Sequence, residues 1–177
     1  MAAPWTPPSW MKQDGELNGS YLLPAHYQDY ADYLVSYVKE LQDTFDIRID
    51  ALSIQNESDE EKTWESCVWT KEEQADFIKN YLGPTLDTSS LDVDIVANEH
   101  TEWSSGFKEW MNYLMDDSVV NTYLDIVAGH RYHSPAASPF PEAKENEKKL
   151  WMTEYYYEHD ASDLLQALYN ARIVHNF

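Results

Sequence analysis

Two glutamates in this chain each stand at the end of an apolar, strand-like run, and carboxylates can do acid, base or nucleophilic chemistry. Glu57 lies within SIQNESD at 53–59, and Glu154 lies within WMTEYY at 151–156. A third glutamate, Glu99, also follows an asparagine after an apolar run. If the runs are parallel strands of one sheet, their carboxyl ends share an edge, so we expect the side chains of Glu57 and Glu154 to converge.

The elements that would position these side chains alternate between strand and helix. A helix is expected over 27–45, where apolar residues recur every three or four positions. A second helix should begin at the capping box formed by Thr70 and Glu73 and end at Gly83-Pro84. The other expected helices cover 107–115, the charged stretch before 150 and 164–171, and the expected strands cover 47–54, 93–97, 124–128 and 150–153.

This alternation is typical of βαβ units and predicts a parallel sheet in an α/β fold. A (β/α)8 barrel and a doubly wound open sheet both show it, so the pattern leaves both architectures open. The sequence has no G-x-G-x-x-G after an expected strand, which argues against dinucleotide binding.

The composition narrows the classes of partner. The chain has 12 Lys and Arg against 32 Asp and Glu, a net charge of -20, which repels nucleic acid and anionic membranes. Aromatic residues make up 14% of the chain, and flat rings beside carboxylates are what carbohydrate sites are built from. Cys67 is the single cysteine, so an intrachain disulfide is excluded and a structural thiol is expected.

Five segments, taken in order, resemble the xylanase branch of glycoside hydrolase family 30. They are PWTPPSWMK (4–12), ALSIQNESD (51–59), ANEHTEW (97–103), AGHRYH (128–133) and LWMTEYYY (150–157). The resemblance implies a (β/α)8 barrel with a side β-domain that hydrolyses β-linked glycans with retention of configuration. It also implies that Glu57 is the acid/base and Glu154 the nucleophile.

The resemblance implies an extent as well. Residues 1–177 would run from about the end of the third barrel strand through the seventh helix, which makes an incomplete catalytic domain with the side β-domain absent. Residues 1–3 would then lie inside a strand. Such a piece leaves parallel strand edges unpaired, and we expect it to be marginally stable or prone to aggregate when made alone.

The retaining mechanism sets two further expectations. The two carboxyl groups should lie about 5–5.5 Å apart, and repulsion between them should raise one of the two pKa values so that a protonated acid is available near neutral pH. The family usually has Pro after the acid/base, whereas this chain has Ser58, which removes a restriction on the backbone of Glu57.

Other side chains near the strand ends are candidates for binding the sugar. Asn56 is expected to donate to the sugar 2-hydroxyl, an interaction that strengthens in the transition state. Glu99 is expected to be a supporting carboxylate near the nucleophile or substrate, and His130 to hydrogen-bond inside the cleft. The candidates for stacking platforms, with packing as the alternative, are Trp5, Trp64, Trp69, Trp103, Tyr132 and Tyr155.

No cofactor or metal is expected. His130 and His133 have a spacing that could suggest a metal, but no third ligand stands in a recognisable frame.

The predicted function is endo-hydrolysis of β-1,4-xylan, with xylan or glucuronoxylan as the polysaccharide partner. A β-glucosidase or β-xylosidase of the same family and a non-catalytic carbohydrate-binding remnant remain as alternatives. The complete protein is expected to be a monomer with no nucleic-acid or membrane partner. The family implies secretion, although the start MAAPWTPPSW lacks the pattern of a signal peptide.

Overall fold

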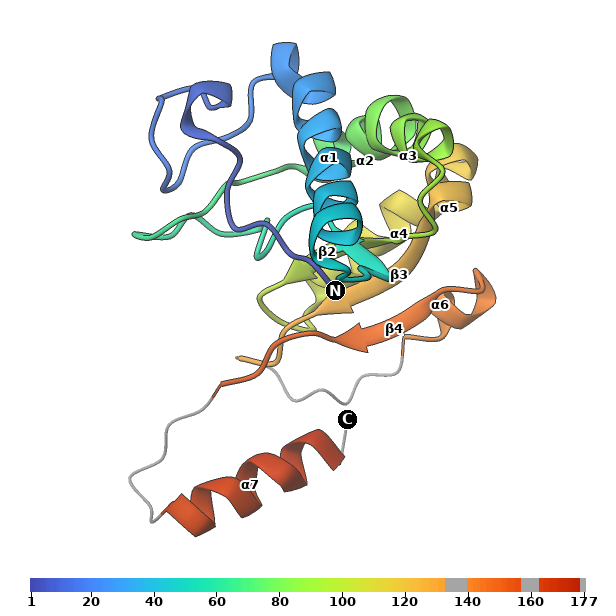
Figure 1. Cartoon of the computed structure of the whole chain (residues 1–177). Helices are drawn as coiled ribbons and strands as arrows, with labels where there is room; N and C mark the ends of the chain where they lie inside the picture. The colour runs from blue at the N-terminus through green and yellow to red at the C-terminus, as the bar shows by residue number, and fades with distance from the viewer. Residues whose placement is uncertain (133–139, 157–162, 176–177) are drawn as a thin grey trace.

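The computed structural model describes residues 1–132, 140–156 and 163–175. Within them, four strands form one parallel sheet (Figure 1). The strands are β1 Ala51–Ser53, β2 Asp94–His100, β3 Leu124–Gly129 and β4 Lys149–Met152, in the order β1-β2-β3-β4. Each strand lies beside the next one in the chain, without the reversal of strand order that defines a doubly wound sheet. The topology is that of part of a (β/α)8 barrel.

Helices connect the strands. Those before and after β1 are α1 Tyr27–Phe45, α2 Lys71–Phe77, the π-helical turn η3 Ile78–Leu82 and α3 Gly83–Ser89. Those further along are α4 Ser105–Asp116, α5 Ser118–Tyr123, α6 Pro141–Glu145 and α7 Asp163–His175, and two short 3-10 turns, η1 Ser9–Met11 and η2 Pro24–His26, precede α1. Figure 1 shows α1, α2, α3 and α5 together on one side of the sheet. None of the described helices is both long and apolar enough to cross a membrane.

The two faces of the sheet carry different side chains because successive residues of a strand point to opposite sides. Leu52, Ile95 and Val127 belong to the main core together with the buried residues of the helices. The opposite face forms a separate cluster of Ala51, Val96, Ile126 and Ala128. The helix-covered face thus holds the larger core, and the second face is lined by small or branched side chains, as the interior of a barrel requires.

The expected helix stop at Gly83-Pro84 is wrong. The capping box of Thr70 and Glu73 opens α2 as predicted, but α2, η3 and α3 follow one another without a break. Pro84 lies in the first turn of α3, directly after the π-helical turn η3, where the hydrogen-bond pattern of the helix changes. Gly83 is required for packing instead, since a Cβ there would lie 2.6 Å from the ring of Tyr123.

The first and last predicted elements also differ in extent. The predicted strand over 47–54 is paired only at Ala51–Ser53, because Asp46 takes a left-handed conformation (φ 54°) and Ile47 N–H bonds back to Leu41 of α1. The predicted closing helix forms as α7, but its leucines bury no face: Leu164 is 69% exposed and Leu168 58% exposed.

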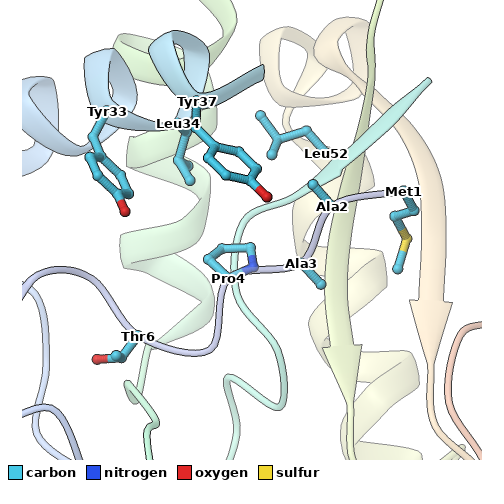
Figure 2. Close-up of a pocket in the computed structure, with 9 residues that line it drawn as sticks. All are labelled: Met1, Ala2, Ala3, Pro4, Thr6, Tyr33, Leu34, Tyr37 and Leu52. Atoms are coloured by element: carbon cyan, nitrogen blue, oxygen red, sulfur yellow. The ribbon is translucent and has the colours of Figure 1, made fainter. Parts of the chain in front are cut away.

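The N-terminal segment lies beside β1. Ala2 forms a parallel bridge with Leu52, its N–H donates to Ala51 O at 2.9 Å, and its carbonyl accepts from Ser53 N at 2.8 Å. Between this segment and α1 lies a groove of about 370 Å³ (Figure 2), into which Tyr37 points. Neither Glu57 nor Glu154 lines this groove. The N-terminal segment matters for the site because it brings Trp5 to the carboxyl end of β1, where Gln55 Nε2 donates to Trp5 O at 2.7 Å.

Candidate active site

Glu57 is held by the ends of β1 and β2 in a strained conformation. Its φ of 48° lies in the left-handed region that non-glycine residues avoid, and Glu99 has a similar φ of 49°. The backbone N–H of Glu57 donates to Glu99 O at 3.0 Å, and Ser58 Oγ donates to Asn98 O at 3.0 Å. The serine that replaces the family's proline therefore ties this turn to β2. Strained residues held by their surroundings are typical of functional sites.

The structure brings the two predicted carboxylates together. One polar atom each of Glu57, His130 and Glu154 lies within 4.8 Å of the others. The three residues follow β1, β3 and β4, so they meet at the carboxyl edge of the sheet. A cleft of about 600 Å³ opens there, lined by Trp5, Glu57, Lys62, Trp64, Thr101, Tyr132, Glu154 and Tyr156.

His130 lies between three carboxylates, those of Glu57, Glu99 and Glu154. Its ring is fully buried, Nδ1 lies 3.1 Å from Glu57 Oε1, and Nε2 lies 3.8 Å from Glu99 Oε1 and 4.0 Å from Glu154 Oε2. Burial lowers the pKa of His130, but the carboxylates, Glu57 first, outweigh it and raise the pKa to about 9. The imidazole is therefore a cation at neutral pH that donates to Glu57, and the predicted hydrogen bond inside the cleft is present.

The expectation that repulsion raises the pKa of the acid/base is wrong for Glu57 in this arrangement. Burial does raise the pKa of Glu57, but the hydrogen bond from His130 and the charge of Lys62 lower it by more, so the net shift is downward. Lys62 Nζ lies 3.2 Å from Glu57 Oε2. With a cation on each oxygen, the carboxylate is anionic near neutral pH while the cleft holds no sugar.

Glu154 is oriented by the segment that follows β3. The N–H of Arg131 donates to Glu154 O at 3.1 Å, and the Tyr132 hydroxyl donates to Glu154 Oε1. Burial and the bond to Glu154 raise the pKa of Tyr132, so its phenol keeps the proton that it donates. Tyr132 was predicted as a stacking ring; it lines the cleft, and its hydroxyl also donates a hydrogen bond to Glu154.

Glu99 stands apart from the pair. It is buried, it does not line the cleft, and its Oε1 lies 3.8 Å from His130 Nε2. This position fits the predicted supporting carboxylate. Asn56 is also buried, and its backbone N–H donates to Pro4 O at 2.9 Å; its predicted contact with the sugar stays a prediction.

The aromatic candidates divide between cleft and core. Trp5 and Trp64 line the cleft and are 45% and 48% exposed. Trp69 is not a platform: it is 3% exposed, and its ring packs 5.3 Å from that of Phe77. It precedes the N-cap of α2, which turns it into the core. Trp103 is likewise buried, against Phe107 of α4.

Three further outcomes concern Tyr155, Lys62 and Cys67. Tyr155 was proposed for the cleft, but its neighbour Tyr156 lines it instead. Lys62 was missed because a lone lysine in a charged loop carries no motif. Cys67 is buried as expected, and burial raises the pKa of its thiol to about 12, which leaves it unreactive.

Among the described residues, Glu57, His130 and Glu154 together offer three atoms that could approach one ion. Nδ1 of His130 is engaged by Glu57 Oε1 at 3.1 Å, so hydrogen bonding within the cluster already uses part of this donor set. The expected absence of a metal stays a prediction. His133, the other histidine considered for a metal, lies outside the described residues.

Comparison with known proteins gives consistent matches. Residues 1–162 match the glycosyl hydrolase family 30 TIM-barrel domain. Glucuronoxylanase XynC of Bacillus subtilis is 28% identical over 99% of this chain and 43% of its own length, and an endo-1,6-beta-D-glucanase of Neurospora crassa is 30% identical over 76% of this chain and 28% of its own. Glucosylceramidases also match.

Solved structures agree. A family 30 subfamily 8 xylanase, Xyn30A from Clostridium acetobutylicum, superposes with a TM-score of 0.84 at 33% identity, covering 98% of this chain and 43% of that one. The chain therefore spans less than half the length of the relatives it matches.

Proposed function

We propose, because the chain belongs to glycosyl hydrolase family 30, that it contributes the catalytic pair of a retaining glycoside hydrolase, with Glu57 as acid/base and Glu154 as nucleophile. The observation that carries this proposal is that one carboxylate oxygen of Glu57 lies within 4.8 Å of one of Glu154. Retaining enzymes hold the two groups about 5–5.5 Å apart, whereas inverting enzymes leave about 6.5–9.5 Å for a water.

The surrounding groups suit the two steps. In the first, Glu154, oriented by the Tyr132 hydroxyl, attacks the anomeric carbon while the glycosidic oxygen takes a proton from Glu57. In the second, anionic Glu57 removes a proton from the water that releases the sugar. His130 and Lys62 favour the anionic form of Glu57, which supports the second step, and the first requires Glu57 to gain a proton before it acts.

The proposed substrate is β-1,4-xylan, cleaved within the chain. The similarity to a glucuronoxylanase extends over nearly all of this sequence, and the open cleft carries exposed rings on which successive sugars could stack. The relative from Neurospora crassa, named for β-1,6-glucan, makes that polymer the second candidate. Because polymeric xylan does not enter cells, we also propose that the enzyme acts outside the cell, which activity measured in medium and lysate would test.

The test follows product stereochemistry. The protein is incubated with a xylo-oligosaccharide, and proton NMR records the first anomer released, with Glu154→Gln as the inactive control. The β-anomer is expected, and the α-anomer would overturn the assignment of Glu154 as nucleophile. Parallel assays on glucuronoxylan, unbranched xylan, β-1,6-glucan and an aryl β-xyloside distinguish the substrates. Binding to xylan without release of reducing sugar would instead indicate a non-catalytic carbohydrate-binding protein.

A further inference from the structure

Lys62 lies in the loop between β1 and α2 and directs its ammonium group at Glu57. Its Nζ is 3.2 Å from Glu57 Oε2 and also donates to Glu60 Oε2. The Lys62 side chain is 16% exposed and that of Glu57 is 9% exposed. Because little water reaches the contact, it is screened far less than an ion pair on the surface. Among the described residues that line the cleft, Lys62 is the one that carries a permanent positive charge.

The loop holds Lys62 in this place. Its backbone N–H donates to Ser66 Oγ at 3.2 Å, and the same oxygen accepts from Gly19 N at 2.8 Å. The carbonyl of the buried Ser66 accepts from Lys12 Nζ at 2.7 Å. The ammonium of Lys62 also lies 5.8 Å from the ring centroid of Trp64. The contact with Glu57 is thus supported by a packed loop, so it does not depend on one long side chain alone.

We propose that Lys62 is a positioning residue for Glu57: it holds Oε2 while His130 holds Oε1, and it sets the pH above which Glu57 no longer has a proton to give. The inference rests on the proposed function insofar as Glu57 is the proton donor. It adds a residue that no motif of the family indicated and that occupies the charged loop after the acid/base turn.

The balance of charge around Glu57 gives the direction of the effect. His130 faces it from the end of β3, Glu154 and Tyr132 from beyond β4 and β3, Glu99 from the end of β2, and Glu60 from its own loop. Without Lys62, the carboxylate of Glu57 would keep one cationic neighbour among several acidic groups. Its pKa should then rise, because the attraction that favours the charged form is lost while burial remains.

The test compares Lys62→Met with Lys62→Arg and with a matched control, Lys71→Met. Lys71 also pairs with a carboxylate, that of Glu109, and lies 5.3 Å from the ring centroid of Tyr113, but it does not line the cleft. The assay is kcat/KM against pH on an aryl xyloside with a poor leaving group. In Lys62→Met the basic limb should move up by about one pH unit, whereas Lys62→Arg and Lys71→Met should keep the wild-type limb. With a dinitrophenyl leaving group, which departs without a proton, the limb should not depend on Lys62.

A second variant guards against loss of folding. Glu60 has a 44% exposed side chain, so Glu60→Gln leaves the packing intact while removing an anion beside Lys62. The basic limb should then move down in pH, opposite to its movement in Lys62→Met. No movement in either variant would overturn the inference while leaving the hydrolase proposal in place.

A titration of Glu57 that does not depend on catalysis separates the role proposed for Lys62 from the proposed hydrolase function. Carbon NMR of labelled glutamate follows the Glu57 carboxyl, assigned from its absence in Glu57→Gln. An upward midpoint in Lys62→Met and a downward one in Glu60→Gln support the positioning role even if no xyloside is hydrolysed, a result that would count against the proposed function alone. Unchanged midpoints contradict the role of Lys62.

Discussion

Replacing Glu57 with Gln should remove the largest single interaction that keeps His130 protonated. The pKa of His130 stands at about 9 against an ordinary 6.5, a difference of about 2.5 units. At 1.36 kcal/mol per unit, its surroundings favour the cation by about 3 kcal/mol net of burial. Glu57 is its nearest carboxylate, at 3.1 Å, and Gln keeps the shape of the side chain without the charge. We expect the pKa of His130 to fall by at least about one unit, since burial then acts with less opposition.

The assay is a pH titration of histidine labelled with ¹⁵N, read by NMR from the imidazole nitrogens. The matched control is Asp29→Asn, which removes the carboxylate 2.7 Å from His26 on the surface and leaves the cleft untouched. The His130 midpoint should be unchanged in that variant. An unchanged midpoint in Glu57→Gln, or a wild-type midpoint near 6.5, would refute the claim that the two groups share a charge-assisted hydrogen bond.

Four further substitutions test the packing of the core, the lining of the cleft and the orientation of Glu154. Trp69→Ala should lower the free energy of unfolding in urea by about 3–5 kcal/mol because the ring is buried. Trp64→Ala should change that free energy by no more than about 0.5 kcal/mol and should raise KM instead. Equal losses of stability would contradict the assignment of Trp69 to the core and Trp64 to the cleft. Gly83→Ala should cost about 1–3 kcal/mol, since its Cβ would meet the Tyr123 ring at 2.6 Å, and an unchanged thermal midpoint would show that the contact relaxes freely. Tyr132→Phe should lower kcat about tenfold or more by removing the donor to Glu154, and wild-type kcat would exclude that role.

Helices were predicted correctly where the residues that form the sequence pattern are the same residues that stabilise the helix. The apolar spacing over 27–45 and the capping box at Thr70 gave α1 and the start of α2 correctly. Gly83-Pro84 misled because the reason for the glycine is Tyr123, which packs against it from a distant part of the chain. A stop signal and a packing requirement look the same in sequence.

The sequence was enough to predict that the two carboxylates meet, but not the direction in which the pKa of Glu57 is shifted. Glu57 and Glu154 were placed at one edge by the alternation of strands and helices, and the structure brings them together. The direction of the Glu57 pKa shift depends on Lys62, whose approach is set by the fold of a loop without a periodic pattern. Trp69 shows the same limit: one position relative to a helix cap decided between cleft and core. The catalytic roles themselves stay predictions.

Trapping the covalent intermediate tests directly whether Glu154 is the nucleophile of a retaining hydrolase. An activated 2-deoxy-2-fluoro-β-xyloside is incubated with the protein, and the modified peptide is identified by mass spectrometry; the fluorine slows both steps, while the good leaving group speeds the attack, so the covalent intermediate accumulates. We expect one fluoroxylosyl group attached to the Glu154 carboxylate and no such group in Glu154→Gln. Attachment to Glu57 or Glu99, or hydrolysis of the parent xyloside without any adduct, would contradict that assignment.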